Sequence, residues 1–513
     1  MDVLAPASVR FGFAIDHRSC IGCHACTVAC KQEHGVELGV FRTWVKYIEQ
    51  GTFPDARRYF SVLRCNHCDD APCVEICPVK ALYKRDDGIV DFDPEQCIGC
   101  KACLNACPYD ALHIDPESHT AAKCNFCAHR VDAGLKPSCE VVCPTQAIVS
   151  GDLDDPESRI SRLIASEETQ VRAPEQGTGP NVYYVGANEA ALDPIQVAGG
   201  EAYLTTEVDP AQREKLMPLA DGAVATVMAD VAHPPPWGRK VSSYFVSKGV
   251  AAGAMMLAPL LLALAADESG LVDLVPGLLA LAGIAVTGVL LVADLKRPDR
   301  FYYLFTRPQW RSWLAIGAQF INLAVLLALA FTAAVLLGWD GPRDVLAWAL
   351  VPAGLMLACY TAFLFGQCDG RDLWESPLLL PHTVVNALVA GAGALAVVAL
   401  AFDMPADVGR LLAWTLVAGC ATAGALIAVD LFAVEHPTGQ AARAARNLWR
   451  DLYARRFWAG GVALGIVLPV SLGASFLLGG GGTVLALAGA SAIAGMWLYE
   501  DAWVRAGQSV PLS

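Results

Sequence analysis

Hydrophobic residues are spread unevenly along this chain of 513 residues. After about residue 240, apolar stretches of roughly 20 residues recur, the length that an α-helix needs to cross a bilayer. Charge or glycine marks their ends, as at Asp267-Glu268, at Asp340-Gly341-Pro342 and at the glycine run 479–482. The pattern predicts eight transmembrane helices, at about 243–266, 277–294, 313–338, 345–367, 378–402, 409–430, 459–479 and 482–499.

The first 195 residues have a different pattern, in which short apolar segments alternate with turns. Residues 81–83, 111–114 and 147–149 are predicted strands, and Asp87-Gly88 supplies a turn before residues 89–92. A longer strand is expected at Asn181 to Val185. Residues 196–242 are richer in Pro, Gly and acidic residues and are expected to be a linker. We therefore predict an α+β domain at 1–195, a linker at 196–242 and an all-α membrane domain at 243–505.

Composition supports the membrane domain and argues against some function classes. The chain is 55% hydrophobic and only 17% charged, which is unusual for a soluble protein. Its net charge of -14 and its lack of a basic patch argue against binding of nucleic acid. The glycine run 479–482 is expected to be a loop, because no strand precedes it and no Lys-Ser/Thr follows it.

Basic residues predict the orientation of the membrane domain. With eight spans, both chain ends lie on one side, and the opposite loops offer only Arg343 and Arg410. By the positive-inside rule, the amino-terminal domain should face the cytoplasm. Residues 1–16 agree, since they show no signal-peptide core and no twin-arginine pair, although a folded subunit can be exported on a partner's signal. The basic residues on the chain-end side are Arg239, Lys240, Lys296, Arg297, Arg300, Arg307, Arg311, Arg371, Arg443, Arg446, Arg450, Arg455, Arg456 and Arg505.

Sixteen of the nineteen cysteines fall between Cys20 and Cys143, in four groups of four. The first and third groups have the C-x2-C-x2-C-x3-C spacing of bacterial ferredoxins. There, three thiolates on a tight loop hold one cubane, and the fourth, opening a helix, reaches the neighbouring cluster. The first group resembles the third and the second resembles the fourth, which indicates two ferredoxin-like units and suits four 4Fe-4S clusters. The groups are Cys20, Cys23, Cys26 and Cys30; Cys65, Cys68, Cys73 and Cys77; Cys97, Cys100, Cys103 and Cys107; and Cys124, Cys127, Cys139 and Cys143.

Three other uses of these cysteines compete with clusters. Structural zinc needs two C-x2-C pairs per ion, and the triplets of the first and third groups have no place in that scheme. Disulfides would require an exported chain, and cysteines two residues apart make poor bridges. The sequence Cys20-Ile-Gly-Cys23-His24 matches a haem attachment pattern, but Lys101 stands where His24 would recur in the third group. Clusters therefore remain the leading interpretation.

These motifs resemble a known family. The first domain, over roughly residues 10–190, resembles the four-cluster electron-transfer subunits of complex iron-sulfur molybdoenzymes, the group that contains dimethyl sulfoxide, polysulfide and tetrathionate reductases. The membrane half resembles the quinone-reactive anchor of the NrfD or polysulfide-reductase type, through residues 294–301 (DLKRPDRF) and Glu435-His436-Pro437. Most relatives divide these domains between two polypeptides, so the chain resembles a fusion.

The resemblance implies crossed ligation of the clusters. The first and fourth groups would be paired, and the second and third groups would be paired in the same way. Because the third group is complete, four 4Fe-4S clusters are implied. The implied ligand sets are Cys20/Cys23/Cys26/Cys143, Cys124/Cys127/Cys139/Cys30, Cys65/Cys68/Cys73/Cys107 and Cys97/Cys100/Cys103/Cys77.

Electrons are expected to pass from the nearest cluster directly to a quinone, with no haem in between. An anchor with two b haems needs four histidines at membrane depth, and only His382 and His436 lie in or near the spans. A quinone site needs an apolar slot and polar groups that exchange protons. Candidates exist for the quinone site and for a proton path, although each of them has a plain structural alternative, such as Lys248 snorkelling to the interface. The quinone-site candidates are Tyr244, Lys248, Asp294, Arg311, His382 and Asn386, and the proton-path candidates are Glu435 and His436.

The leading interpretation is a subunit of a quinone-linked oxidoreductase that lacks its own substrate site. It would carry electrons between a separate molybdenum or tungsten pterin subunit and menaquinone or ubiquinone, with quinone reduction slightly favoured. The alternative is the equivalent subunit of a nickel-iron hydrogenase or of a cytochrome-linked respiratory complex. A third possibility is an ion pump, which buried and mutually spaced acids would favour, but mid-span acids are nearly absent, and this favours simple quinone chemistry.

Overall fold

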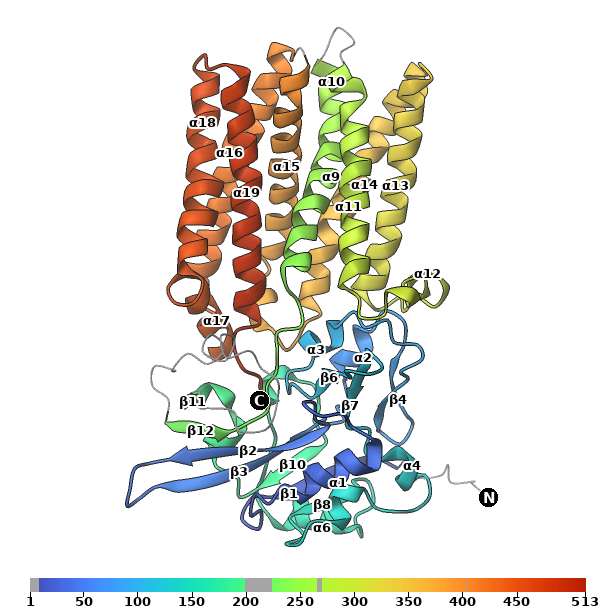
Figure 1. The fold of residues 1–513 in the computed structure, drawn as a ribbon, viewed down its shortest axis with the longest axis vertical. Coiled ribbons are helices and arrows are strands. Elements are labelled where there is room, and N and C mark those ends of the chain that lie inside the picture. The colour runs from blue at the N-terminus through green and yellow to red at the C-terminus, as the bar shows by residue number, and fades with distance from the viewer. Residues whose placement is uncertain (1–8, 199–223, 265–269, 403) are drawn as a thin grey trace. The chain divides into compact units, whose positions relative to one another are not determined.

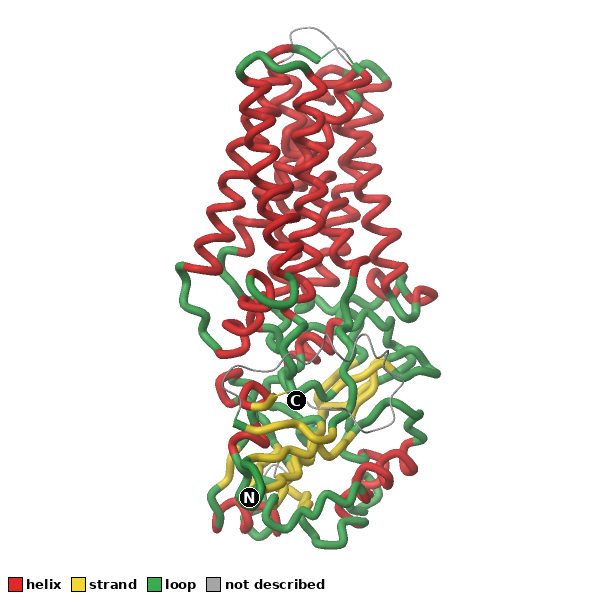
Figure 2. Tube along the Cα trace, turned by 60° about the vertical axis from the view of Figure 1, so that its left-hand side comes forward, coloured by secondary structure: helices red, strands yellow, loops and turns green. Residues whose placement is uncertain are grey.

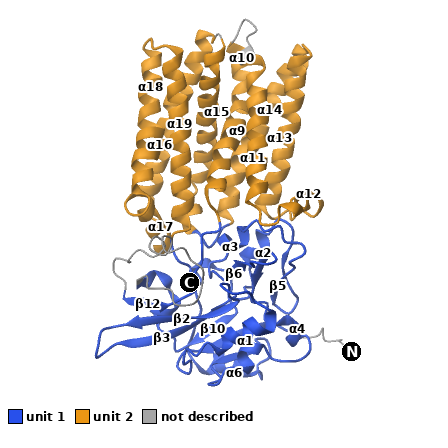
Figure 3. Ribbon diagram, in the orientation of Figure 1, with its two compact units in different colours: residues 1–236, 368–371, 510–513 blue, residues 237–367, 372–509 orange. Residues whose placement is uncertain are grey.

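Unit 1, in the computed structural model, combines small sheets with short helices. The structure describes residues 9–198, 224–264, 270–402 and 404–513. Contacts divide the chain into two compact units (Figure 3). Unit 1 comprises residues 1–236, 368–371 and 510–513, and unit 2 comprises residues 237–367 and 372–509. The predicted linker at 196–242 falls partly on residues 199–223, outside the described residues.

Two four-stranded sheets form the frame of unit 1. The first has the order β8 (Ile148–Asp152), β1 (Phe11–Asp16), β10 (Val182–Val185) and β9 (Thr169–Gln170). Strand β1 runs parallel to β10 and antiparallel to β8, and its four central residues are buried. The second has the order β11 (Val197–Ala198), β12 (Ala225–Ala229), β2 (Thr43–Gln50) and β3 (Arg57–Arg64). The strand expected at Asn181 to Val185 is confirmed as β10.

Two small hairpins separate the cysteine groups. The first joins β4 (Leu82–Lys84) to β5 (Val90–Phe92), and Gly88 has a φ of 82°, which suits the predicted turn. The second joins β6 (Leu112–Ile114) to β7 (Ala121–Lys123). The α+β architecture with small sheets is confirmed (Figure 1). The helices of unit 1 are α1 (Ala25–His34), α2 (Pro72–Glu75), α3 (Ala102–Ala106), α4 (Ala128–Val131), α5 (Ser138–Val141), α6 (Arg159–Ser166) and α7 (Glu189–Leu192).

Unit 1 also contains residues from the second half of the chain. The Lys46 ammonium donates to the backbone carbonyl of Ser513, and the Arg172 guanidinium donates to that of Leu512 at 2.7 Å. Arg371 donates to the Asn105 side chain at 3.3 Å and to the Val510 carbonyl at 3.1 Å. All three cations are buried. Segments 368–371 and 510–513 are therefore packed parts of this unit's fold.

Unit 2 contains eight helices that are long and apolar enough to cross a membrane among the described residues, which confirms the predicted number. Figure 2 shows them as long coils that run side by side. Shorter helices at the ends of the bundle are α10 (Gly270–Asp273), α12 (Tyr303–Thr306) and α17 (Gly439–Trp449). The spans are α9 (Arg239–Leu264), α11 (Val275–Asp294), α13 (Trp313–Leu336), α14 (Asp340–Gly366), α15 with its last turn (Leu379–Ala401), α16 (Ala406–Phe432), η6 with α18 (Arg456–Leu477) and α19 (Gly482–Gly507).

The eight spans form two groups of four. Helix α9 packs with α11 and α14, and α13 packs with α14, whereas α15 packs with α16 and α19 in the other group. Helices α9 and α15 join the groups, and glycine allows them to touch. A Cβ on Gly253 would lie only 1.9 Å from the Ala387 carbonyl oxygen, and a Cβ on Gly391 would lie 2.4 Å from the Gly253 carbonyl carbon. Small residues at such a crossing let two membrane helices approach closely.

The seventh span begins as a π-helix, η6 (Arg456–Val467), and continues as α18 (Leu468–Leu477). Pro469 lacks an amide hydrogen, and in an α-helix its ring would crowd the carbonyl of Gly465. Gly465 and Gly495 of α19 pack so closely that a Cβ on Gly495 would lie 2.1 Å from the Gly465 Cα.

Candidate functional site

Two cavities in unit 1 are lined by cysteines from different groups. One is lined by Cys77 of the second group together with Cys97, Cys100 and Cys103. The other is lined by Cys143 of the fourth group together with Cys20, Cys23 and Cys26. All sixteen thiols are free of disulfides. Four thiolates around one cavity form a donor set that suits a 4Fe-4S cluster, so the residues fit this cofactor.

Burial makes the thiols of these groups hard to ionise in the absence of a metal. Burial raises the pKa of Cys26 to about 11 and that of Cys124 to about 12, because an isolated thiolate is poorly stabilised away from water. Bound iron replaces the proton and stabilises the thiolate. Backbone amides also donate to the sulfurs, from Ala81 to Cys77 at 3.2 Å and from Gly99 to Cys97 at 3.4 Å. Such donors stabilise negative charge on the sulfurs.

The duplication is visible in the backbone of the first and third groups. Gly22 and His24 have φ values of 69° and 59°, and Gly99 and Lys101 have φ values of 67° and 65°. A side chain at Gly22 would also be blocked, because its Cβ would lie 2.4 Å from the Phe60 ring. His24 therefore occupies the same left-handed turn position as Lys101, directly before a helix.

One expectation about these groups is wrong. The fourth cysteine of each group does not open a helix, because α1 begins at Ala25 and includes both Cys26 and Cys30. In the third group Cys107 lies just after α3 ends. Residues four apart share one face of a helix, one turn from each other. Cys26 and Cys30 therefore lie one turn apart along α1.

A chain of polar side chains lies within the membrane unit. The Asn386 amide on α15 donates to the Glu500 carboxylate on α19 at 3.0 Å and lies 3.3 Å from His382 Nε2. Glu500 is only 4% exposed and His382 only 7%. The His382 ring also meets the Tyr499 ring edge-on, with their centroids 5.5 Å apart. These four residues thus form one connected group inside an apolar bundle.

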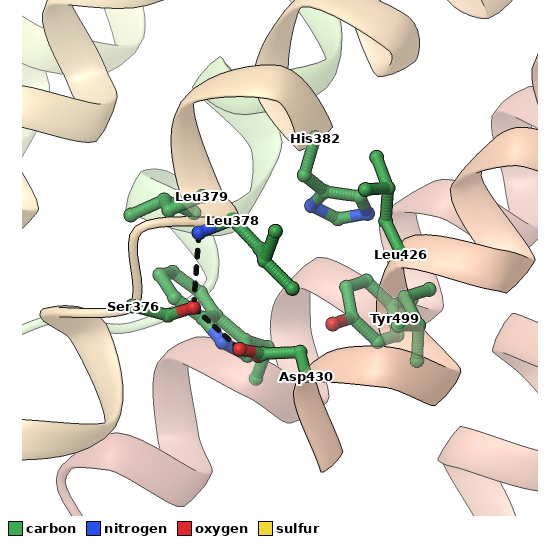
Figure 4. A pocket seen from close by; sticks show the side chains of 9 residues that line it. Ser376, Leu378, Leu379, His382, Leu426, Asp430 and Tyr499 are labelled. Atoms are coloured by element: carbon green, nitrogen blue, oxygen red, sulfur yellow. Dashed lines mark hydrogen bonds between the residues drawn. The ribbon is translucent and has the colours of Figure 1, made fainter. Parts of the chain in front are cut away.

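Two cavities adjoin this polar group. The first is lined by Ser376, His382, Asp430 and Tyr499 together with Leu378, Leu379, Leu426, Ile427 and Trp503. Figure 4 shows His382 and Tyr499 facing this space, and the Ser376 hydroxyl donating to the Asp430 carboxylate. The second is lined by His382, Asn386 and Tyr499 together with Cys420, Ile427, Gly461, Gly465 and six further residues. His382, Ile427 and Tyr499 line both cavities, so polar groups border apolar space there.

Lys248 lies deep in the bundle on α9. Its side chain is 3% exposed, and its ammonium donates to the Ala358 carbonyl at 3.1 Å and to the Thr361 hydroxyl. The ammonium also lies over the Tyr360 ring, 4.8 Å from its centroid. It interacts electrostatically with Glu500, although the two make no ion pair within 4.0 Å among the described residues. Lys248 therefore does not snorkel to the surface.

The other candidates lie apart from this group. Tyr244 is buried on α9 with its ring against Phe245, Asp294 is the last residue of α11, and Arg311 is exposed before α13. None of the three lines either cavity. Glu435 is exposed and His436 half-buried in the segment between α16 and α17, where His436 interacts electrostatically with Asp430.

Two acids within a span were missed by sequence reasoning. The eighth span was predicted to end at residue 499, but α19 continues to Gly507, so Glu500 and Asp501 lie inside it. Both lie within the last eight residues of α19, so the prediction that mid-span acids are nearly absent stays a prediction. Asp501 forms ion pairs with Arg456 at 2.6 Å and with Arg505 at 3.0 Å. The apolar run after Asp501 was the signal that the helix continues.

Comparison with known proteins agrees with both units. Residues 56–153 match the 4Fe-4S dicluster domain, and residues 229–510 match the family described as polysulphide reductase, NrfD. A tetrathionate reductase subunit of Salmonella typhimurium is 42% identical over 190 residues, which cover 36% of this chain and 76% of that protein. Two further relatives are also named as reductase subunits or chains.

A putative dimethyl sulfoxide reductase iron-sulfur subunit of Halobacterium salinarum is 36% identical over 247 residues, covering 42% of this chain and 92% of that protein. A polysulfide reductase chain of Wolinella succinogenes is 39% identical over 187 residues, covering 36% of this chain and 98% of that protein. With its cysteine-lined cavities and its eight long apolar helices, the chain belongs to the polysulphide reductase NrfD family and is an integral membrane protein in which this anchor is fused to a 4Fe-4S electron-transfer subunit.

Proposed function

We propose that this chain carries electrons between a separate molybdenum or tungsten pterin subunit and the membrane quinone pool. The proposal is supported above all by the buried group of Asn386, His382 and Glu500, which borders apolar space within a membrane bundle. A buried acid and a buried histidine are costly within a membrane bundle, so such groups commonly mark a functional site. The fusion supplies the complementary part, sixteen cysteines for one-electron carriers.

Four 4Fe-4S clusters are proposed, with the crossed ligand sets given by the resemblance. Each cluster supplies a one-electron carrier when bound. The chain's own contribution is to hold the iron with buried thiolates and to donate backbone amides to them. The two cysteine-lined cavities support the sets that join Cys77 to the third group and Cys143 to the first.

A quinone would be bound in the cavities beside His382. Leu378, Leu379 and Leu426 would contact its ring, and His382 and Tyr499 would donate to or accept from its oxygens. Reduction of a quinone to a quinol takes two electrons and two protons. Glu500, whose carboxylate holds the Asn386 amide beside His382, and Asp430 would exchange those protons. His436, which interacts with Asp430, and its neighbour Glu435 would extend the path. Menaquinone or ubiquinone fits this chemistry, and quinone reduction with the cluster unit in the cytoplasm is favoured.

The catalytic subunit is proposed to dock where a cluster lies near the surface of unit 1. Cys23 is exposed, and exposed apolar side chains lie on α1, on α5, which packs against it, and on the adjoining loops. Patches of this kind on soluble surfaces commonly mark protein interfaces. The names of the relatives, which are subunits of tetrathionate, dimethyl sulfoxide and polysulfide reductases, support a catalytic partner of the molybdoenzyme type. The exposed apolar residues are Ile21, Val28, Leu38, Val141 and Val142.

Replacing Val28 and Val141 with aspartate is expected to release the catalytic subunit. Two charges buried in an apolar interface should weaken docking at least about tenfold, while the clusters still assemble. Co-purification through a tag on this chain measures the effect. Phe53→Asp is the matched control, because Phe53 is 93% exposed on the β2–β3 connection. Full retention of the partner by the double variant would place the interface elsewhere.

The whole proposal is tested by purifying the complex from its native membrane. Molybdenum or tungsten is expected in the largest subunit, together with iron for four cubanes in this chain. Adding menaquinone or ubiquinone to the reduced complex should reoxidise the clusters, seen as recovery of their visible absorption. Nickel in place of molybdenum or tungsten would favour the hydrogenase alternative. Clusters that quinones leave reduced would contradict quinone chemistry.

A further inference from the structure

The duplication places a buried cation directly before the second and the fourth cysteine group. Arg64 ends β3 and precedes Cys65, and Lys123 ends β7 and precedes Cys124. The sequences that follow, RCNHC and KCNFC, correspond to each other. Both side chains are 0% exposed. A cation that is completely removed from water is costly unless negative charge lies beside it.

Arg64 meets sulfur rather than a carboxylate. Its Nη1 donates to Cys139 Sγ at 3.1 Å, and its guanidinium lies over the Phe13 ring, 4.5 Å from the centroid. It also interacts electrostatically with Cys26 and Cys124. Among residues 9–198, 224–264, 270–402 and 404–513, its Nε and Nη2 have no hydrogen-bond partner. Under crossed ligation Cys26 belongs to one cluster and Cys139 to another, so Arg64 adjoins two clusters.

Lys123 is arranged differently at the corresponding position. Its ammonium donates to the backbone carbonyls of Val90 and, at 3.0 Å, of Cys124. These carbonyl oxygens offset part of the positive charge of Lys123. Lys123 acts on Cys73, a thiolate of the second group, only through its electrostatic field. Of the two duplicated cations, Arg64 alone donates a hydrogen bond to the sulfur of a cluster cysteine in the described part of the chain.

Four thiolates give a 4Fe-4S site a net negative charge, and uptake of one electron from a donor adds one further negative charge. A fixed cation beside the site stabilises the more negative, reduced state. We propose that Arg64 is a shared counter-ion that raises the reduction potentials of the two clusters ligated by the first and fourth groups. The hydrogen bond to Cys139 makes the effect larger on the cluster of the fourth group. The assignment rests on the crossed ligation within the proposed function.

The proposal is tested by EPR-monitored redox titration of the whole complex carrying Arg64→Met, Arg64→Gln or Arg64→Lys. Without the cation, reduction of at least one cluster should become about tenfold less favourable, which corresponds to about 59 mV for a one-electron couple. Arg64→Gln, which loses the charge but keeps a donor, should also lower the potential, by no more than Arg64→Met does. Arg64→Lys should restore most of the wild-type potential.

Lys46→Met is the matched control, because Lys46 is a buried cation on the neighbouring strand β2 that pairs with Asp230 at 3.5 Å. It should leave the cluster potentials unchanged. Wild-type potentials in fully assembled Arg64→Met and Arg64→Gln would overturn the proposal. So would a fall of equal size in Arg64→Lys, or a failure of both uncharged variants to assemble clusters, which would assign Arg64 to assembly. Loss of quinone reactivity in the wild-type complex would contradict the proposed function but not the role of Arg64 in setting the potentials.

Discussion

Alanine at both Cys77 and Cys97 is expected to remove one cluster from the complex rather than two. The two cysteines belong to different groups in the sequence but line one cavity. If they ligate the same cubane, the second substitution removes a ligand from a site that is already lost. The double variant should then lose about one quarter of the cluster iron of a four-cluster protein, as either single variant does. Electron transfer through this chain should stop in all three.

The matched comparison is alanine at both Cys65 and Cys77, which lie in one group of the sequence. Crossed ligation assigns them to different cubanes, so this pair should lose two clusters. Iron and sulfide content per chain, with the spin count of the reduced protein, measures both variants. Opposite results, with two clusters lost at Cys77/Cys97 and one at Cys65/Cys77, would show that each group holds its own cluster.

Lys248→Ala and His382→Ala are each expected to abolish quinone-linked turnover while dye-linked activity survives. His382 lines both cavities and lies 3.3 Å from the Asn386 amide. Its loss therefore removes a proton-exchanging group from the proposed quinone site. Lys248 is buried and interacts electrostatically with Glu500, so its loss alters the electrostatic environment of this acid. Groups of this kind contribute about 10²- to 10⁴-fold to proton-transfer steps.

Lys240→Ala is the control for Lys248→Ala, because Lys240 lies on the same helix but is exposed and donates to the Ala293 carbonyl at its end. It should keep full quinone turnover. Cluster content and the amount of chain in the membrane must be equal in all variants, so that the loss cannot be attributed to misfolding. Unchanged quinone kinetics in both Lys248→Ala and His382→Ala would refute the proposed quinone site.

Local sequence patterns predicted most of the architecture. A membrane helix satisfies its backbone internally and must present apolar side chains to lipid, so a continuous apolar run indicates both its length and its position. The hairpin β4–β5 followed from Asp87-Gly88 between short apolar segments. The cysteine spacing was an equally local signal, because the size of a cluster sets the spacing of its ligands along a loop.

The polar group of the membrane unit was only partly predictable, since it depends on which helices are neighbours. His382 and Asn386 are four residues apart on one helix and could be paired from the sequence. Glu500 could not be joined to them, because nothing in a single sequence shows that α15 packs on α19. Charges at Glu500-Asp501 resembled the end of a span, whereas Arg456 and Arg505 pair with Asp501 and allow the helix to continue. Asp294 and Arg311 were chosen because they lie at the ends of predicted spans on the cluster-facing side. The packing of the helices leaves both outside the two cavities.

The carboxyl-terminal segment 510–513 has a consequence for how the protein is made. Lys46 and Arg172 bond to Ser513 and Leu512, so these contacts form only after the ribosome has translated every membrane span. At about 5–20 residues per second, the roughly 270 residues after Pro236 take tens of seconds to synthesise. During that interval Arg172 lacks its bond to Leu512, and Lys46 has Asp230 but not yet Ser513 as a partner. The fold of unit 1 is therefore completed only after the anchor has been translated.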